Sequence, residues 1–292
     1  GTYALKGYRR SADDPRDRLG AEIAGLAYAA SVLPGSVPEI VGADRTAGVA
    51  AYEWIEGEPV SEVGAAEIEE ALALAAALHR GRTIPLAGSF PAASEAILRP
   101  ADLRTQLFSR LERLSQVASS EPELEQLLSG RLRPALARFE PALADVRPPT
   151  AGERTLSPSD FGFHNALRRE GRLVFLDFEY FGWDDPAKLV CDFLWHPGMT
   201  LGPGERRQFL AGATDAFKEG ISFVSRLHAY EPLIALRWAA IVLGEFLPEV
   251  WERRKYAGRA APADHASAKQ RQLAKARAIL DRLETETERP RC

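Results

Sequence analysis

Long apolar segments and cysteines are what this sequence has least of. No apolar run approaches the roughly 20 residues that a helix needs to cross a bilayer, which argues against a membrane protein. The first residues do not follow the charged-then-apolar order of a secretion signal. With only two cysteines, Cys191 and Cys292, the chain has no disulfide framework. These absences predict a cytoplasmic protein without a membrane partner.

The sequence also lacks a zinc-like motif and a strong charge. Its five histidines are widely separated, without the close spacing of a zinc site. The formal net charge of −4 gives no overall attraction to nucleic acid, so we expect no nucleic-acid partner. Hydrophobic residues make up 46% of the 292 residues and charged residues 27%, as in ordinary globular proteins. The length allows one large domain or two lobes.

Local patterns predict two regions of different structure. Apolar alternation indicates strands at 2–8, 37–41 and 49–54, and a helix at 17–30 follows capping candidates at 11–15. Beyond residue 59 the pattern is helical, apart from one hairpin. The expected helices lie at 65–79, 93–118, 121–145, 186–195, 204–218, 229–254 and 264–286.

The hairpin follows a loop that is rich in polar residues. Residues 166–169 and 173–176 form its predicted strands, joined by a Glu-Gly turn at 170–171. Asn165 precedes the first strand and Asp177 follows the second, so we expect the two side chains to lie together. Asp160 is five residues before Asn165, in the loop that enters the hairpin.

An aspartate, an asparagine and a second aspartate in this order suit phosphoryl transfer. That reaction uses one carboxylate to receive the proton of an acceptor hydroxyl, and an amide with a carboxylate to hold magnesium on the phosphates. Any single aspartate in such a loop is more simply explained as a turn former or a cap. The order and spacing together favour a kinase-like site.

The spacing Asp-x4-Asn, a hairpin and then Asp-Phe-Glu resembles the aminoglycoside phosphotransferase and choline kinase-like family, which shares the protein-kinase fold. The Gly-Trp-Asp-Asp-Pro segment at 182–186 and the later Asp192 are similar to that family's continuation. The resemblance implies an α+β, two-lobed protein-kinase-like fold. Its small lobe would span 1–58 and lack the first β-hairpin, and its helical lobe would span 59–292.

The same resemblance assigns roles in a catalytic loop at 157–165 and a metal motif at 177–179. It implies that Asp160 is the catalytic base, and that Asn165 and Asp177 bind Mg²⁺. One departure is Pro158, because the family usually has histidine two residues before the base. That histidine mainly supports the loop, so the replacement concerns loop geometry more than chemistry.

On the nucleotide side, Lys6 stands where the fold's third strand carries a lysine for the α- and β-phosphates of ATP. The resemblance implies that Glu22 pairs with it, and that backbone groups of Glu53 and Ile55 bind the adenine. An exposed strand lysine and a solvated helix glutamate are the alternative. The two strands and the phosphate-covering turn that precede this lysine in kinase-like folds are missing. We expect them to have been trimmed or lost to a wrong start codon, and a divergent lobe or an inactive descendant are the alternatives.

The acceptor is less defined by the sequence. A cationic acceptor would favour acids and aromatic residues, whereas a sugar or sugar phosphate would favour arginine and polar groups. Both kinds occur, so the substrate stays open. The candidates are Tyr180, Trp183, Asp184, Arg237, Trp238 and Glu245.

The sequence therefore predicts an ATP- and Mg²⁺-dependent O-phosphotransferase acting on a hydroxyl of a small molecule, such as an aminoglycoside, an amino-alcohol or a sugar-like compound. The alternative is a catalytically inactive kinase-like scaffold. The missing hairpin and Pro158 favour this alternative. A protein kinase proper is disfavoured, because no room for an activation segment exists between Asp177 and the next helix.

Overall fold

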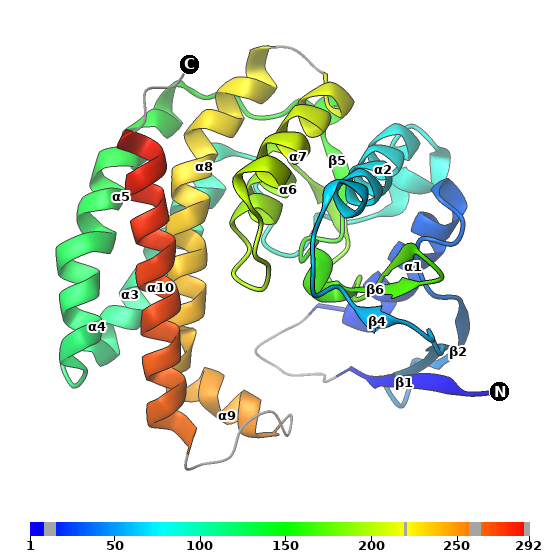
Figure 1. Ribbon diagram of the computed structural model, residues 1–292, viewed down its shortest axis with the longest axis horizontal. Helices are drawn as coiled ribbons and strands as arrows, with labels where there is room; N and C mark the ends of the chain where they lie inside the picture. Colours follow the sequence, from blue (N-terminus) through cyan, green and yellow to red (C-terminus); the bar gives the residue numbers. More distant parts are fainter. Residues whose placement is uncertain (9–15, 219–220, 257–263, 289–292) are drawn as a thin grey trace. The chain divides into compact units, whose positions relative to one another are not determined.

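The computed structural model describes residues 1–8, 16–218, 221–256 and 264–288 (Figure 1). The helix start expected at 11–15 and Cys292 lie outside the described residues. The chain divides into two compact units. The first combines Gly1–Leu98, Pro149–Leu194 and Gly198–Phe223, and the second combines Arg99–Pro148, Trp195–Pro197 and Val224–Cys292. These two units are not the lobes expected at 1–58 and 59–292, so the expected lobe boundary at residue 58 stays a prediction.

The first unit contains every described strand together with several helices. In chain order they are β1 (Tyr3–Gly7), α1 (Arg18–Val32), β2 (Ile40–Asp44), β3 (Val49–Glu53), β4 (Glu58–Pro59), α2 (Ala65–Gly81), η1 (Pro85–Ser89), η4 (Ala151–Glu153), β5 (Thr155–Ser157), η5 (Phe163–Asn165), β6 (Ala166–Arg169), β7 (Arg172–Phe175), β8 (Gly182–Asp184), α6 (Pro186–Trp195) and α7 (Pro203–Ala216).

The first three strands form an antiparallel sheet in the order β1-β3-β2 (Figure 1). Ala4 pairs with Tyr52 and Lys6 pairs with Ala50. Directly opposed residues of antiparallel strands point to the same face, so Lys6 shares a face with the buried Tyr52. The strand predicted at 37–41 is wrong in its position. Pro38 has no N–H to donate to a ladder, and β2 begins at Ile40.

Helix α1 places one acidic residue on its buried face. Asp17 caps the helix by accepting a hydrogen bond from the Gly20 N–H at 2.9 Å. One turn later Glu22 is buried, together with Leu19 and Leu26. A carboxylate on an otherwise apolar face needs a partner, because burying an unpaired charge is costly.

The predicted hairpin is confirmed. Strands β6 and β7 pair in antiparallel register, and β4 pairs with the other edge of β6. Glu170 and Gly171 both have positive φ, 51° and 80°, as a two-residue hairpin turn requires. Beyond the paired strands, the Leu176 N–H donates to the Asn165 carbonyl at 2.7 Å. This bond brings the residues on either side of the hairpin together.

A buried lysine forms ion pairs that connect β8 and α6, the two elements that follow the hairpin. Lys188, on α6, is 0% exposed and forms ion pairs with Asp184 at 2.8 Å and Asp192 at 2.9 Å. Burial raises the pKa of Asp184, and the Lys188 charge acts against this rise. The lysine also lies 3.5 Å from the Ser159 hydroxyl. The cluster therefore connects α6 and β8 to the loop that carries Asp160.

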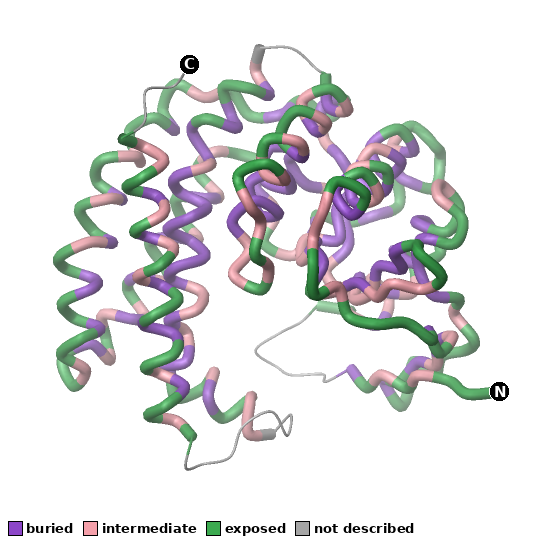
Figure 2. The backbone as a smooth tube through the Cα atoms, in the orientation of Figure 1, coloured by how far each residue is buried: buried purple, intermediate pink, exposed green. Residues whose placement is uncertain are grey.

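The second unit is helical throughout its described residues. In chain order its elements are α3 (Pro100–Ala118), α4 (Pro122–Leu127), the π-helical turn η2 (Leu128–Leu132), α5 (Arg133–Phe139), η3 (Glu140–Asp145), α8 (Ile221–Val242, whose first turn belongs to the first unit), η6 (Leu243–Phe246), α9 (Pro248–Tyr256) and α10 (His265–Glu288). Figure 2 shows that α8 is buried along most of its length.

Three helix predictions are wrong in their extent, and prolines account for much of the difference. The helix expected at 93–118 begins at Pro100, because residues 92–94 instead bond to the β8 region as extended chain. The helix expected at 121–145 is divided into four short elements around Pro134 and Pro141, which lack a donor. The helix expected at 229–254 is instead α8, which begins at Ile221 and ends at Val242 and is followed by η6 and, from Pro248, by α9. None of the described helices is both long and apolar enough for a membrane crossing.

We predict that Lys188→Met lowers the free energy of unfolding by about 3–5 kcal/mol, because two buried carboxylates lose their counter-charge. Denaturant unfolding measures the loss. The matched control replaces Asp184 and Asp192 by asparagine in the same variant, and most of the stability should return. A single variant as stable as the unchanged chain would contradict a structural role for this cluster.

A second prediction concerns acid. Burial, followed by the charges of Arg82 and Arg80, lowers the pKa of His79 to about 4. Below pH ~6.5 the unfolded chain binds a proton that the folded chain excludes, so stability falls toward pH ~4, by at most about 1.4 kcal/mol per pH unit. Thermal unfolding of His79→Gln between these pH values should show a flatter slope. The control His228→Gln changes an exposed histidine and should keep the slope.

Candidate functional site

The loop that carries Asp160 is folded tightly on itself. The Asp160 N–H donates to the Pro158 carbonyl at 2.9 Å, and the Ser159 N–H donates to the Ser157 hydroxyl at 3.0 Å. The Ser159 hydroxyl donates to the Ser94 carbonyl at 2.9 Å. These bonds hold the loop in place with proline where the resembled family has histidine.

Two site residues have a strained backbone. Ser159 and Asp177 have φ values of 68° and 64°, in the left-handed region that non-glycine residues seldom adopt. Such conformations cost roughly 1–3 kcal/mol each and gather at functional sites. Here one strained residue directly precedes Asp160, and the other is the aspartate that follows the hairpin.

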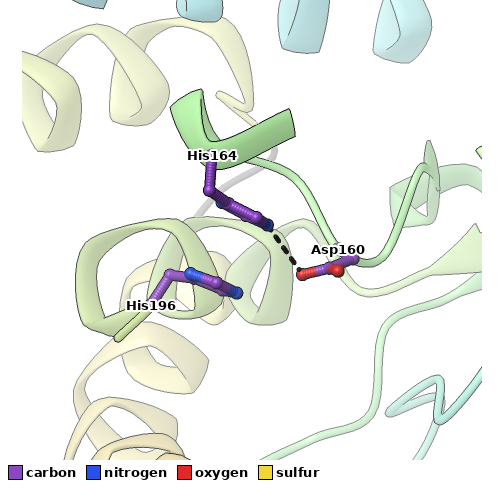
Figure 3. A group of neighbouring side chains, drawn as sticks. All are labelled: Asp160, His164 and His196. Atoms are coloured by element: carbon purple, nitrogen blue, oxygen red, sulfur yellow. Dashed lines mark hydrogen bonds and ion pairs between the residues drawn. The ribbon is translucent and has the colours of Figure 1, made fainter. Parts of the chain in front are cut away.

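Asp160 has two polar neighbours from its own loop. His164 Nε2 lies 3.2 Å from Asp160 Oδ1 (Figure 3). The Asn165 side-chain N–H₂ group donates to the Asp160 carbonyl at 3.0 Å and lies 3.4 Å from Oδ2. The Asp160 side chain is 34% exposed, so a small molecule has access to it. The sequence predicts Asp160 and Asn165 for this site but misses His164, whose signal is its position four residues after Asp160.

Lys6 lies among three carboxylates. Its Nζ is 2.6 Å from Glu22, 2.7 Å from Asp177 and 3.4 Å from Glu179. Burial lowers the pKa of Lys6, but the Asp177 and Glu22 charges outweigh it, and the net pKa lies well above the usual value. Lys6 is therefore a permanent positive charge at the end of the hairpin.

The carboxylates around Lys6 also form a candidate cation site. One oxygen from each of Glu22, Asp177 and Glu179 lies within 4.8 Å of the others. Asp177 is 38% exposed, whereas Glu22 is 4% exposed and already bound to Lys6. The Glu179 carboxylate is held by Arg18 at 2.9 Å. The sequence did not select Glu179, although its position two residues after Asp177 was a signal.

These donors fit the magnesium ion that the resemblance implies. Mg²⁺ prefers oxygen ligands and uses one or two carboxylates together with substrate phosphates. Asp177 and Glu179 offer such oxygens. Asn165 uses its N–H₂ group toward Asp160, and its amide oxygen takes no part in those bonds. The structure thus joins Asn165 to Asp160 and Asp177 to Lys6, and the hydrogen bond between Asn165 and Leu176 connects the two groups.

The predicted adenine-binding segment begins at Glu53, the last residue of β3. The Glu53 N–H donates to the Glu39 carbonyl at 2.9 Å, and its side chain pairs with Arg169 at 2.5 Å. Ile55 is buried at 7% exposure. These contacts fix the segment at the end of the sheet, and its contact with adenine stays a prediction.

Most of the acceptor candidates have structural roles. Asp184 is buried in an ion pair with Lys188, and the Trp183 indole N–H donates a hydrogen bond to the Ala87 carbonyl. In the second unit, Arg237 and Trp238 are buried, and Glu245 is buried against Arg254. Tyr180 differs from these. Its ring lies 5.3 Å and 5.2 Å from the guanidinium groups of the two arginines at 16 and 18. Burial and the nearby Glu179 raise its pKa to about 12.

Comparisons with solved structures show the fold. A choline/ethanolamine kinase family protein from Mesorhizobium loti has a TM-score of 0.58 at 18% identity, over 99% of this chain and 84% of that chain. The AMP-bound complex of spectinomycin phosphotransferase APH(9)-Ia has a TM-score of 0.64 at 12% identity, over 94% and 87%. Choline kinase LicA from Streptococcus pneumoniae has a TM-score of 0.54 at 17% identity, over 94% and 86%.

These likenesses confirm the predicted α+β, protein-kinase-like fold class. A search of curated proteins finds no match. At the sequence level, a model of the phosphotransferase enzyme family matches residues 1–221. Because this match spans more than half of the 292 residues, the chain belongs to the phosphotransferase enzyme family.

Proposed function

We propose that this protein transfers the terminal phosphoryl group of ATP, with Mg²⁺, to a hydroxyl group of a small molecule. The observation that carries the proposal is the arrangement at the hairpin. At the open end of the hairpin, the partly exposed Asp160 lies beside Asn165 before the first strand, and Asp177 lies beside Lys6 after the second strand. Acceptor activation and phosphate binding need such groups next to each other.

Each residue has a separate task in this reaction. Asp160 orients the acceptor hydroxyl and receives its proton late, as the bond to phosphorus forms. Lys6 binds the α- and β-phosphates, and Glu22 holds Lys6 in place. Asp177 and Asn165 are the proposed ligands of Mg²⁺, with Glu179 beside them. When bound, Mg²⁺ supplies positive charge against the phosphate oxygens. The protein contributes mainly positioning and electrostatic stabilisation.

The family and the structural neighbours support this function and leave the acceptor open. One solved neighbour is described as a complex of spectinomycin phosphotransferase with ADP and spectinomycin, and it matches with a TM-score of 0.62. Others are described as choline kinase, ethanolamine kinase and macrolide 2'-phosphotransferase. We therefore propose an adenine nucleotide as donor and a small hydroxyl compound as acceptor. Pro158 keeps an inactive scaffold as the second candidate.

The reaction itself is tested by a nucleotide-consumption screen across amino-alcohols, sugars and aminoglycosides. With an acceptor from that screen, Asp160→Ala should lower turnover by roughly two to four orders of magnitude, the contribution of a general base. ATP should still bind, as measured by calorimetry. The control Asp215→Ala removes an exposed carboxylate and should leave turnover unchanged. Normal turnover in Asp160→Ala would remove Asp160 from its proposed role.

A different result is expected for Asp177, which follows the second strand of the hairpin. Asp177→Ala should weaken the binding of MgATP by at least about tenfold, the loss typical even of residues that only support a metal ligand. Calorimetric titrations with and without magnesium measure the effect. Without the ion, the variant and the unchanged chain should bind ATP with similar affinity. Undiminished binding of MgATP would refute the assignment of Asp177 to the metal.

A further inference from the structure

Two buried tyrosines lie behind the Lys6–Glu22 ion pair. The Tyr8 hydroxyl donates to Glu22 Oε2 at 2.5 Å, and Lys6 Nζ donates to the same oxygen at 2.6 Å. The Tyr8 hydroxyl also lies 2.5 Å from the Tyr52 hydroxyl. Tyr8 and Tyr52 are 9% and 5% exposed, so water has little access to these bonds.

The direction of the hydrogen bonds follows from the number of protons. A tyrosine hydroxyl has one proton, and Tyr8 uses it toward Glu22. The bond between the two tyrosines must therefore run from the Tyr52 O–H to the Tyr8 oxygen. Burial, and after it the bond to Glu22, raise the pKa of Tyr8 far above its usual value. Tyr8 thus remains a donor at neutral pH.

The fold places these groups together from three elements. Lys6 and Tyr8 are two residues apart at the end of β1, so their side chains point to one face. Tyr52, on β3, faces the same side through its pairing with Ala4. Glu22 reaches them from the buried face of α1. The Tyr8 N–H donates to the Gly48 carbonyl at 2.8 Å, which fixes the end of the strand.

The arrangement matters because Lys6 has a choice of partners. A lysine ammonium is a compact charge on a flexible stem, and nothing in its own geometry selects one carboxylate. All three carboxylates belong to the candidate cation site, but Glu22 is 4% exposed, whereas Asp177 is 38% exposed. A loosely held Glu22 would let Lys6 stay with the other two carboxylates, where it competes with a cation and draws away from the phosphates.

We propose that Tyr8 and Tyr52 are positioning residues for the nucleotide phosphates. By fixing the Glu22 carboxylate they keep one partner of Lys6 in place, beside the contacts that Lys6 makes with Asp177 and Glu179. This inference rests on the proposed function, because it assigns to Lys6 the binding of the ATP phosphates. Tyr8 acts directly on Glu22, and Tyr52 acts through Tyr8, so the effect of Tyr8 is the larger.

The test measures binding of MgATP and of adenosine to the full chain by calorimetry. Tyr8→Phe should bind MgATP about tenfold more weakly, because a hydrogen bond to a charged group is lost. Tyr52→Phe should lose affinity by a smaller factor. Adenosine, which has no phosphates, should bind both variants and the unchanged chain equally. In phosphorus NMR, the α- and β-resonances of MgATP bound to Tyr8→Phe should shift toward those seen with Glu22→Gln.

Tyr28→Phe is the matched control. Tyr28 lies on α1 with Glu22, is 0% exposed, and its hydroxyl has no hydrogen-bond partner among the residues that the structure describes. Removing this hydroxyl should leave MgATP affinity unchanged. Adding Tyr8→Phe to Glu22→Gln should cause no further loss, because both changes act on one contact.

Three results would overturn the inference while leaving the proposed function intact. They are unchanged MgATP affinity in Tyr8→Phe, an equal loss for adenosine and MgATP, or losses that add up in the double variant with Glu22→Gln. If Tyr8→Phe does not fold, Tyr52→Phe carries the same comparison, since it leaves the bond between Tyr8 and Glu22 in place. An unchanged chain that does not bind MgATP would instead overturn the proposed function, and the inference with it.

Discussion

The hydrogen bond from the Leu176 N–H to the Asn165 carbonyl closes the hairpin at its open end, and the site is arranged around this bond. It fixes the distance between the loop that carries Asp160 and the residues that begin at Asp177. If the pairing register of the hairpin shifted by one residue, the side chains of the shifted strand would point to the opposite face of the sheet. The two positive φ values at the Glu170–Gly171 turn set the register and so protect this arrangement.

The two lysines Lys188 and Lys6 are both held by carboxylates but differ in their exposure to solvent. Each is held between carboxylates at ion-pair distance. Lys188 is sealed from water, so its ion pairs serve to fasten α6 and β8. Lys6 is 31% exposed, and its partner Asp177 is 38% exposed. Solvent therefore reaches the second cluster and screens its ion pairs more than those of Lys188.

The site could be predicted from the sequence where its residues are close in the chain. Asp160, Asn165 and Asp177 are separated by one loop and one hairpin, whose turn chemistry is local. The bond between Tyr8 and Tyr52 joins residues 44 apart, and that between Lys6 and Asp177 joins residues 171 apart. Spacing says nothing about such contacts. The resemblance to a family suggested the role of Lys6 but gave no reason to select Tyr8.

Most helices and strands follow from local pattern, including the hairpin and the Asp17 cap, because turn and capping preferences depend on neighbouring residues. Helix limits were wrong where extended chain beside β8 or a proline took over from apolar periodicity, as at Pro100, Pro134 and Pro141. Only the tertiary structure decided which charged side chains are buried, which are exposed to solvent, and which hydrogen-bond donors hold the Glu22 carboxylate. Those properties depend on burial and on contacts between distant segments, and neither is encoded in the order of nearby residues.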